Sequence, residues 1–189
     1  MVKIAPSILA ADLMDMTNEI KLVDANGADY IHIDVMDGHY VNNIAFGPNM
    51  VKSMRPHTKK ILDVHLMISP VKKFVDEFIA AGADIISFHP DADKNSRDIL
   101  NQIKSANCKA GIAIHPKVSI NEIVSFLDLI DIVIVMTVVP GFGGQKFMQS
   151  EVNKIIELSK IRKKRNLSYE IEIDGGINSE TGKICKDAN

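Results

Sequence analysis

The 189-residue sequence predicts an α/β fold, a TIM (β/α)8 barrel, from three observations. Seven strand-like runs alternate with amphipathic stretches, which is typical of a parallel sheet whose strands are joined by crossover helices. No strand is followed by G-x-G-x-x-G or by G-x-x-x-x-G-K-[ST], so the usual nucleotide-binding motifs of an open doubly wound sheet are absent. The second strand carries a row of polar side chains, which favours a closed barrel over an open sheet.

The expected strands follow one another along the whole chain. They comprise residues 3–8, 30–36, 61–67, 85–90, 109–116, 131–138 and 169–177. Between them, residues 70–81 (PVKKFVDEFIAA) repeat apolar side chains at helical spacing. The basic run 160–165 is expected at the end of a helix, where positive charge favours the helix dipole.

The second strand has two unlike faces. Side chains alternate across a strand, so three aliphatic residues of 30–36 share one face and His32, Asp34 and Met36 share the other. The aliphatic face is expected to contact helices. The polar face is then expected to point into a barrel, where the carboxyl ends of the strands form active sites.

A short repeated motif indicates how many βα units of the barrel the chain contains. Residues 24–29 (DANGAD) lead into the second strand and residues 80–84 (AAGAD) lead into the fourth. Residues 186–189 (KDAN) match the beginning of this repeated motif. We therefore expect a single barrel domain over residues 1–189 that is truncated before the eighth strand and lacks the last βα unit.

The composition excludes several classes of protein. Lys and Arg number 22 against 24 Asp and Glu, a net charge of −2, without the basic stripe that nucleic acid requires. No apolar run approaches the ~20 residues that cross a bilayer, and the N-terminus does not resemble a signal peptide. Cys108 and Cys185 are too few for a disulfide framework. We expect a cytoplasmic protein that binds neither nucleic acid nor membrane, and a homo-oligomer stays open.

Three expected strands carry potential metal ligands near their carboxyl ends. His32 and Asp34 come from the second strand, His65 from the third and Asp174 from the seventh. Two imidazoles and two carboxylates suit a divalent ion such as zinc, iron(II), manganese or cobalt. The sequence does not decide between these metals.

Three methionines are expected beside these side chains. Met36 and Met67 follow His32 and His65 on the same strand faces, and Met136 ends the sixth strand. Each alone is typical of a core methionine. Above a metal-bound substrate they would form an apolar ceiling.

Two glycine-rich loops follow the sixth and seventh strands. Loops of this kind at the carboxyl face of a barrel let backbone N–H groups approach a phosphate. Their candidate substrate-binding residues are Gly141, Phe142, Gly143, Gly144, Gly175 and Gly176. The sequence therefore predicts a small phosphorylated substrate, although tight turns alone would explain either loop taken by itself.

Six strings of the sequence resemble one known family over essentially the whole chain. They are APSILAAD, HIDVMDGHYV, DVHLM, FHPDAD, MTVVPGFGGQKF and EIDGGIN, and they resemble ribulose-phosphate 3-epimerases. The resemblance implies a (β/α)8 barrel that interconverts ribulose 5-phosphate and xylulose 5-phosphate in the pentose phosphate pathway. It implies that Asp34 and Asp174 form the acid/base pair and, with His32 and His65, bind the metal. It also implies that Ser7 and His65 contact the substrate and that the glycine loops bind its phosphate.

Other functions compete with the one that this resemblance implies. An allulose-6-phosphate 3-epimerase would use the same metal and carboxylates, so the sequence separates the two weakly. A decarboxylase or aldolase with an Asp-x-Lys-x-x-Asp motif is excluded because His65 stands where that Lys would be. A non-catalytic barrel remnant also stays open.

Overall fold

The computed structural model describes residues 2–189. Seven strands form its sheet: β1 Tyr30–Asp37, β2 Ile44–Ala45, β3 Ile61–Met67, β4 Ile85–Phe88, β5 Lys109–Ile114, β6 Ile132–Met136 and β7 Glu170–Asp174. Six α-helices accompany them: α1 Met16–Ala25, α2 Pro48–Met54, α3 Val75–Ala81, α4 Ser96–Ser105, α5 Val152–Arg165 and α6 Ser179–Asp187. None of the helices in residues 2–189 is both long and apolar enough to cross a membrane.

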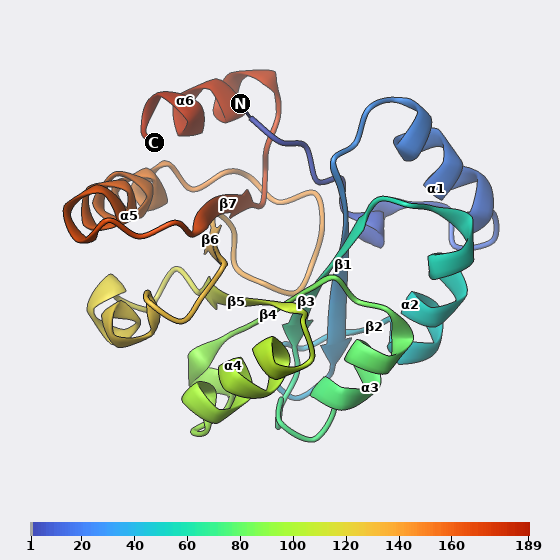
Figure 1. Cartoon of the computed structure of the whole chain (residues 1–189). Helices are drawn as coiled ribbons and strands as arrows, with labels where there is room; N and C mark the ends of the chain where they lie inside the picture. Colours follow the sequence, from blue (N-terminus) through green and yellow to red (C-terminus); the bar gives the residue numbers. More distant parts are fainter. Residues whose placement is uncertain (1) are drawn as a thin grey trace.

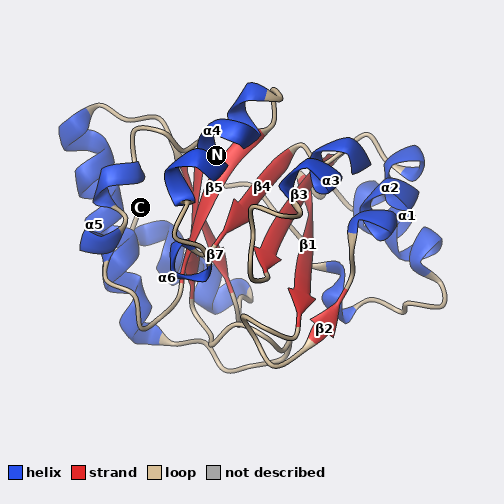
Figure 2. Ribbon diagram, turned by 90° about the horizontal axis from the view of Figure 1, so that it is seen from below, coloured by secondary structure: helices blue, strands red, loops and turns tan. Residues whose placement is uncertain are grey.

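The sheet curls like part of a barrel and remains open on one side. Its strand order is β2-β1-β3-β4-β5-β6-β7, and all pairs are parallel except the short antiparallel pair of β1 and β2. The helices lie outside the sheet (Figures 1 and 2). Within residues 2–189, no backbone ladder joins the segment 3–8 to β7. The predicted α/β-barrel architecture is therefore confirmed, in the form of an incomplete barrel.

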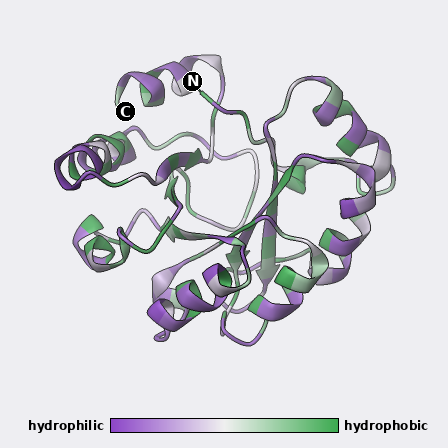
Figure 3. Cartoon of the chain, in the orientation of Figure 1, coloured by the Kyte–Doolittle hydropathy of each residue, from purple (hydrophilic) through white to green (hydrophobic). Residues whose placement is uncertain are grey.

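The hydrophobic core lies between the sheet and the helices. Ile31, Ile33 and Val35 of β1 are buried in this core together with α3 and α4 side chains such as Phe78 and Leu100. Parallel strands covered by helices read as apolar runs on their outer face. Figure 3 shows the apolar strands in the middle and hydrophilic residues on the outer sides of the helices. The predicted division of β1 into an aliphatic helix-facing side and a polar inner side is confirmed.

The prediction of a regular strand over residues 3–8 is wrong. The segment runs beside β1, and its Ile4 and Pro6 carbonyls accept bonds from Asp29 N at 2.8 Å and His32 N at 2.9 Å. Only Ser7 forms a bridge with β1, and residues Ile8–Ala10 turn into a 3-10 helix. Proline at position 6 has no N–H to donate, and no second strand pairs on the other side, so a ladder does not form.

Two predicted helical regions differ in length. Residues 70–81 form a helix only from Val75 onward; residues 72–74 form a turn in which Phe74 N donates to Val71 O at 3.0 Å, and the N–H of Lys72 donates to Asp93 Oδ2 at 3.1 Å. The connection from β5 to β6 contains 3-10 turns at Ile120–Glu122 and Val124–Phe126 instead of an α-helix. The basic run 160–165 does end α5, as predicted.

The central strands should dominate stability. Leu62 of β3 is fully buried in the main core, whereas Leu22 of α1 is 59% exposed. We expect Leu62→Ala to lower the free energy of unfolding by about 2–5 kcal/mol because it leaves a cavity. Leu22→Ala, the same chemical change at an exposed site, should alter it by less than about 0.5 kcal/mol. Urea unfolding of both variants checks this, and equal losses would contradict the assignment of the core.

Candidate metal and proton-transfer site

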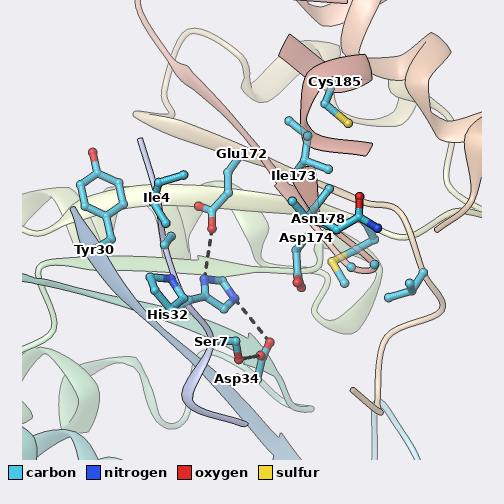
Figure 4. A pocket seen from close by; sticks show the side chains of 18 of the residues that line it. Ile4, Ser7, Tyr30, His32, Asp34, Glu172, Ile173, Asp174, Asn178 and Cys185 are labelled. Carbon is cyan, nitrogen blue, oxygen red and sulfur yellow. Dashed lines mark hydrogen bonds and ion pairs between the residues drawn. The ribbon is translucent and has the colours of Figure 1, made fainter. Parts of the chain in front are cut away.

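A cavity of about 1300 Å³ opens along the gap in the sheet. Its walls come from the segment 2–10, from β7 and α6, and from the loop after β6. Polar side chains at the carboxyl ends of β1 and β7 reach its floor (Figure 4). This is the end of a parallel α/β barrel at which active sites are found.

Four predicted residues converge at this cavity, three of them in its lining and His65 fully buried beside Asp34. His32, Asp34, His65 and Asp174 each offer one nitrogen or oxygen atom, and these atoms lie within 4.8 Å of one another. The first three side chains are buried and Asp174 is partly buried. Strands β1, β3 and β7 place them there, since alternate residues of each strand point to the inside. The spacing is compatible with a shared small cation.

Asp34 lies at the centre of the cluster. Its Oδ2 accepts a bond from Ser7 Oγ at 2.6 Å, and its Oδ1 lies 3.2 Å from His65 Nδ1 and 3.4 Å from His32 Nε2. Burial alone would raise the pKa of Asp34, but the imidazoles of His32 and His65 outweigh burial and hold this pKa well below its ordinary value. Asp34 is therefore ionised at neutral pH.

Asp174 is shifted in the opposite direction. Its Oδ2 lies 3.8 Å from His65 Nδ1. Burial, followed by the charge of Asp34, raises the pKa of Asp174 above its ordinary value. One site thus holds two carboxylates whose surroundings separate their proton affinities, which is the arrangement expected of an acid and a base acting together.

In His32 and His65, a contact at one ring nitrogen determines which nitrogen faces the cluster. His65 Nε2 lies 3.0 Å from His89 Nε2. Burial and the neighbouring His65 hold the pKa of His89 well below its ordinary value, so His89 is neutral. A neutral His89 can accept the Nε2–H of His65, and this contact turns His65 Nδ1 toward Asp34 and Asp174.

His32 is held by carboxylates. Its Nδ1 lies 2.7 Å from Asp63 Oδ2 and 3.1 Å from Glu172 Oε1. Burial opposes the charge, but Asp34, Asp63 and Glu172 together raise the pKa of His32 well above its ordinary value. Burial, then the charge of Asp63, raises the pKa of Glu172 to about 8. Figure 4 shows the ring between Glu172 and Asp34.

The methionines and the glycine loops also line the cavity. Met36, Met67 and Met136 are buried there, and Met36 is the direct neighbour of Met67 across the β1–β3 pair. The remaining predicted substrate-binding residues of the loops share the cavity wall: Gly141, Phe142, Gly143, Gly144, Gly175 and Gly176. Phe142 is 58% exposed at the rim. The predicted site residues thus line one cavity, except for His65, which is fully buried in contact with Asp34 of the lining.

Sequence reasoning missed Asp63, Glu172 and His89. The first two stand two positions before His65 and Asp174, so strand alternation puts them on the same inner face. The patterns D-x-H and E-x-D repeat the H-x-D pattern of β1. That repetition was a signal in the sequence. His89 follows β4, and nothing local in the sequence indicates that it contacts His65.

The architecture agrees with that of solved α/β proteins. A mutant tryptophan synthase alpha-subunit from Pyrococcus furiosus superposes with a TM-score of 0.75 over 98% of this chain and 84% of that chain, at 13% identity. A second mutant of that subunit gives a TM-score of 0.72 at 14% identity. At these identities the likeness concerns the fold alone. Together with the cluster of ionisable residues in the cavity, the fold defines an enzyme of the α/β-barrel class.

Sequence comparisons narrow this class to one family. The Ribulose-phosphate 3 epimerase family model matches residues 3–189. A ribulose-phosphate 3-epimerase of Bacillus subtilis is 46% identical, with 100% of this chain and 87% of the relative covered. One from Rhodobacter capsulatus is 44% identical over 97% of this chain and 79% of the relative. The chain belongs to the ribulose-phosphate 3-epimerase family.

Proposed function

We propose that this chain interconverts D-ribulose 5-phosphate and D-xylulose 5-phosphate by moving a proton at carbon 3, as part of the pentose phosphate pathway. The observation that carries the proposal is the convergence of two carboxylates from different strands, Asp34 and Asp174, whose oxygens lie within 4.8 Å of each other beside two histidines. Their pKa values are shifted in opposite directions. The names of the relatives, ribulose-phosphate 3-epimerase, support the same reaction. Residues 1–189 are proposed to act as one domain, because one sheet and one main core link the described residues 2–189.

The four-residue cluster fits a single divalent ion. His32 Nε2 is buried and has no hydrogen-bond partner, so this nitrogen is available to a divalent ion that displaces its proton. With Asp34, His65 and Asp174 it makes a mixed nitrogen and oxygen donor set that suits zinc, iron(II), manganese or cobalt. When bound, such an ion stabilises the negative charge that develops on the ketone oxygen of the substrate, at the carbon next to carbon 3.

The two carboxylates supply the proton transfers. Epimerisation requires that a proton leave carbon 3 on one face and that another arrive on the opposite face. Asp34, held ionised, accepts the first proton, while Asp174, whose pKa is raised, donates the second. In the reverse direction the roles exchange. Ser7 fixes the orientation of Asp34 through its 2.6 Å hydrogen bond.

The rest of the cavity suits the remaining parts of the substrate. Met36, Met67 and Met136 provide apolar contacts that exclude water from the reacting carbon. The loops at 141–144 and 175–176 offer backbone N–H groups to the phosphate. A cytoplasmic setting is supported by the free cysteines Cys108 and Cys185. A homo-oligomer stays a prediction.

The proposal is tested by turnover and metal content of the same preparation. We expect the chain to form xylulose 5-phosphate from ribulose 5-phosphate and to bind one divalent ion. His65→Gln should weaken binding of zinc by more than the about 10–100-fold typical of supporting residues, because it removes a ligand. His57→Gln, at an exposed histidine of the segment Arg55–His57, should leave binding unchanged.

Each measurement can contradict a separate part of the proposal. A metal-loaded chain without turnover would favour a non-catalytic barrel protein. A chain that turns over substrate with equal rates before and after complete chelation would show that the four residues do not act through a metal.

A further inference from the structure

Behind the four-residue cluster lies a second polar group that the reaction itself does not require. It consists of Asp63 of β3 and Glu172 of β7, both in contact with Nδ1 of His32. Asp63 is 0% exposed and the Glu172 side chain is 14% exposed. A buried carboxylate is costly unless it is paired and hydrogen-bonded, so two of them around one ring nitrogen call for an explanation.

The geometry of His32 supplies that explanation. Its ring bridges the two polar groups, with Nδ1 toward Asp63 and Glu172 and Nε2 toward Asp34 at 3.4 Å. A carboxylate accepts a hydrogen bond but, when ionised, cannot donate one. Asp63 Oδ2, at 2.7 Å, therefore accepts the Nδ1–H of His32, and this contact is shorter than the one between Nε2 and Asp34. Nε2, the buried atom without a hydrogen-bond partner in the described structure, is then the ring nitrogen left for a cation that displaces its proton.

We propose that Asp63 and Glu172 are positioning residues that fix the tautomer and orientation of His32, so that its Nε2 serves as a metal ligand. The proposal rests on the metal site proposed above. Ligating histidines usually donate their other N–H to a carboxylate or carbonyl group, and such partners raise the basicity of the ligand. Asp63 is the stronger partner, because its oxygen lies 0.4 Å closer to Nδ1 (2.7 Å against 3.1 Å) and it is fully buried.

Isosteric amides test this role. We expect Asp63→Asn to weaken zinc binding by about 10–100-fold and Glu172→Gln to weaken it less. An Asn side chain can turn its amide toward Nδ1 as a donor, which moves the ring proton to Nε2 and blocks the ligand atom. Glu151→Gln removes a buried carboxylate outside this group, at the beginning of α5, and should leave zinc binding unchanged.

Binding is measured by competition with a chromogenic chelator, using zinc alone. Ring ¹⁵N shifts of the zinc-loaded chain report the tautomer of His32, which should carry its proton on Nδ1 in the wild type. A loss of that signature in Asp63→Asn, together with weaker binding and an unchanged far-ultraviolet circular dichroism spectrum, would support the role.

A second background separates positioning from a general structural effect. In His32→Gln the ring is absent, so adding Asp63→Asn should cause no further loss of zinc affinity. A loss of equal size in both backgrounds would overturn the proposal, because Asp63 would then act without His32. Two bound ions in the wild type that fall to one in Asp63→Asn would also overturn it, by making Asp63 a ligand. A wild-type chain that binds no ion would overturn the proposed metal site itself. A wild-type chain that binds zinc with the same affinity as Asp63→Asn would overturn only the positioning role.

Discussion

Replacing Asp34 or Asp174 with Asn should nearly abolish exchange of the substrate's carbon 3 proton with solvent. Asn keeps the shape of Asp but carries no transferable carboxyl proton. Loss of general acid–base catalysis costs about 10²–10⁴-fold in rate. Loss of a metal-ligating oxygen adds to this. The measurement is incorporation of deuterium from heavy water into ribulose 5-phosphate, followed by nuclear magnetic resonance.

The two variants should also differ in a way that the structure predicts. Asp34 contacts Ser7, His32 and His65, whereas Asp174 approaches the cluster at 3.8 Å from His65. Asp34→Asn should therefore lower zinc affinity more. Asp128→Asn, at a side chain that is 52% exposed and remote from the cavity, is the control. Near-normal exchange in either site variant would remove that residue from the acid/base pair.

Gly176→Ala should strongly destabilise the loop after β7. Gly176 has φ +66°, and a Cβ there would lie 2.6 Å from the backbone N and 2.8 Å from the Cα of Phe147. Backbone strain costs about 1–3 kcal/mol, and overpacking adds about 1–3 kcal/mol. The collision is with backbone, so a change of side-chain rotamer does not relieve it. We expect a loss of several kcal/mol in the free energy of unfolding, measured in urea.

The neighbouring glycine loop offers two matched controls. A Cβ at Gly143 meets nothing within 4 Å, so Gly143→Ala should be nearly neutral in stability. Gly144 has equally open space but φ +71°, so Gly144→Ala should cost about 1–2 kcal/mol from conformation alone. Equal stability of all three variants would contradict the close approach of the Gly176 backbone to Phe147.

Much of the fold and the position of the site followed from local pattern. The strand expected over 61–67 is β3 without change, and the one expected over 30–36 differs from β1 only by including Asp37. Such strands are long apolar runs with period-two polar residues, and that pattern is determined by neighbours in the sequence. The same period placed His32 and Asp34 on the inner face. The roles of the cluster in metal binding and proton transfer stay predictions.

Other features depended on contacts between distant segments. The segment 3–8 is extended but unpaired on one side, and residues 72–74 form a turn that is tied to the distant Asp93 through the N–H of Lys72. These outcomes depend on where a distant strand or side chain lies. Local propensity carries no information about that.

The sequence by itself determined the α/β-barrel class, the inner face of each strand and the residue types that meet at its carboxyl end. Only the tertiary structure decided which atoms face one another. His32 directs Nε2 to Asp34 because Asp63 and Glu172, from two other strands, occupy Nδ1. His65 directs Nδ1 to the same place because His89 occupies Nε2. The physical reason is that alternation fixes the direction of a side chain, whereas the hydrogen bonding of its ring nitrogens depends on partners across the curled sheet.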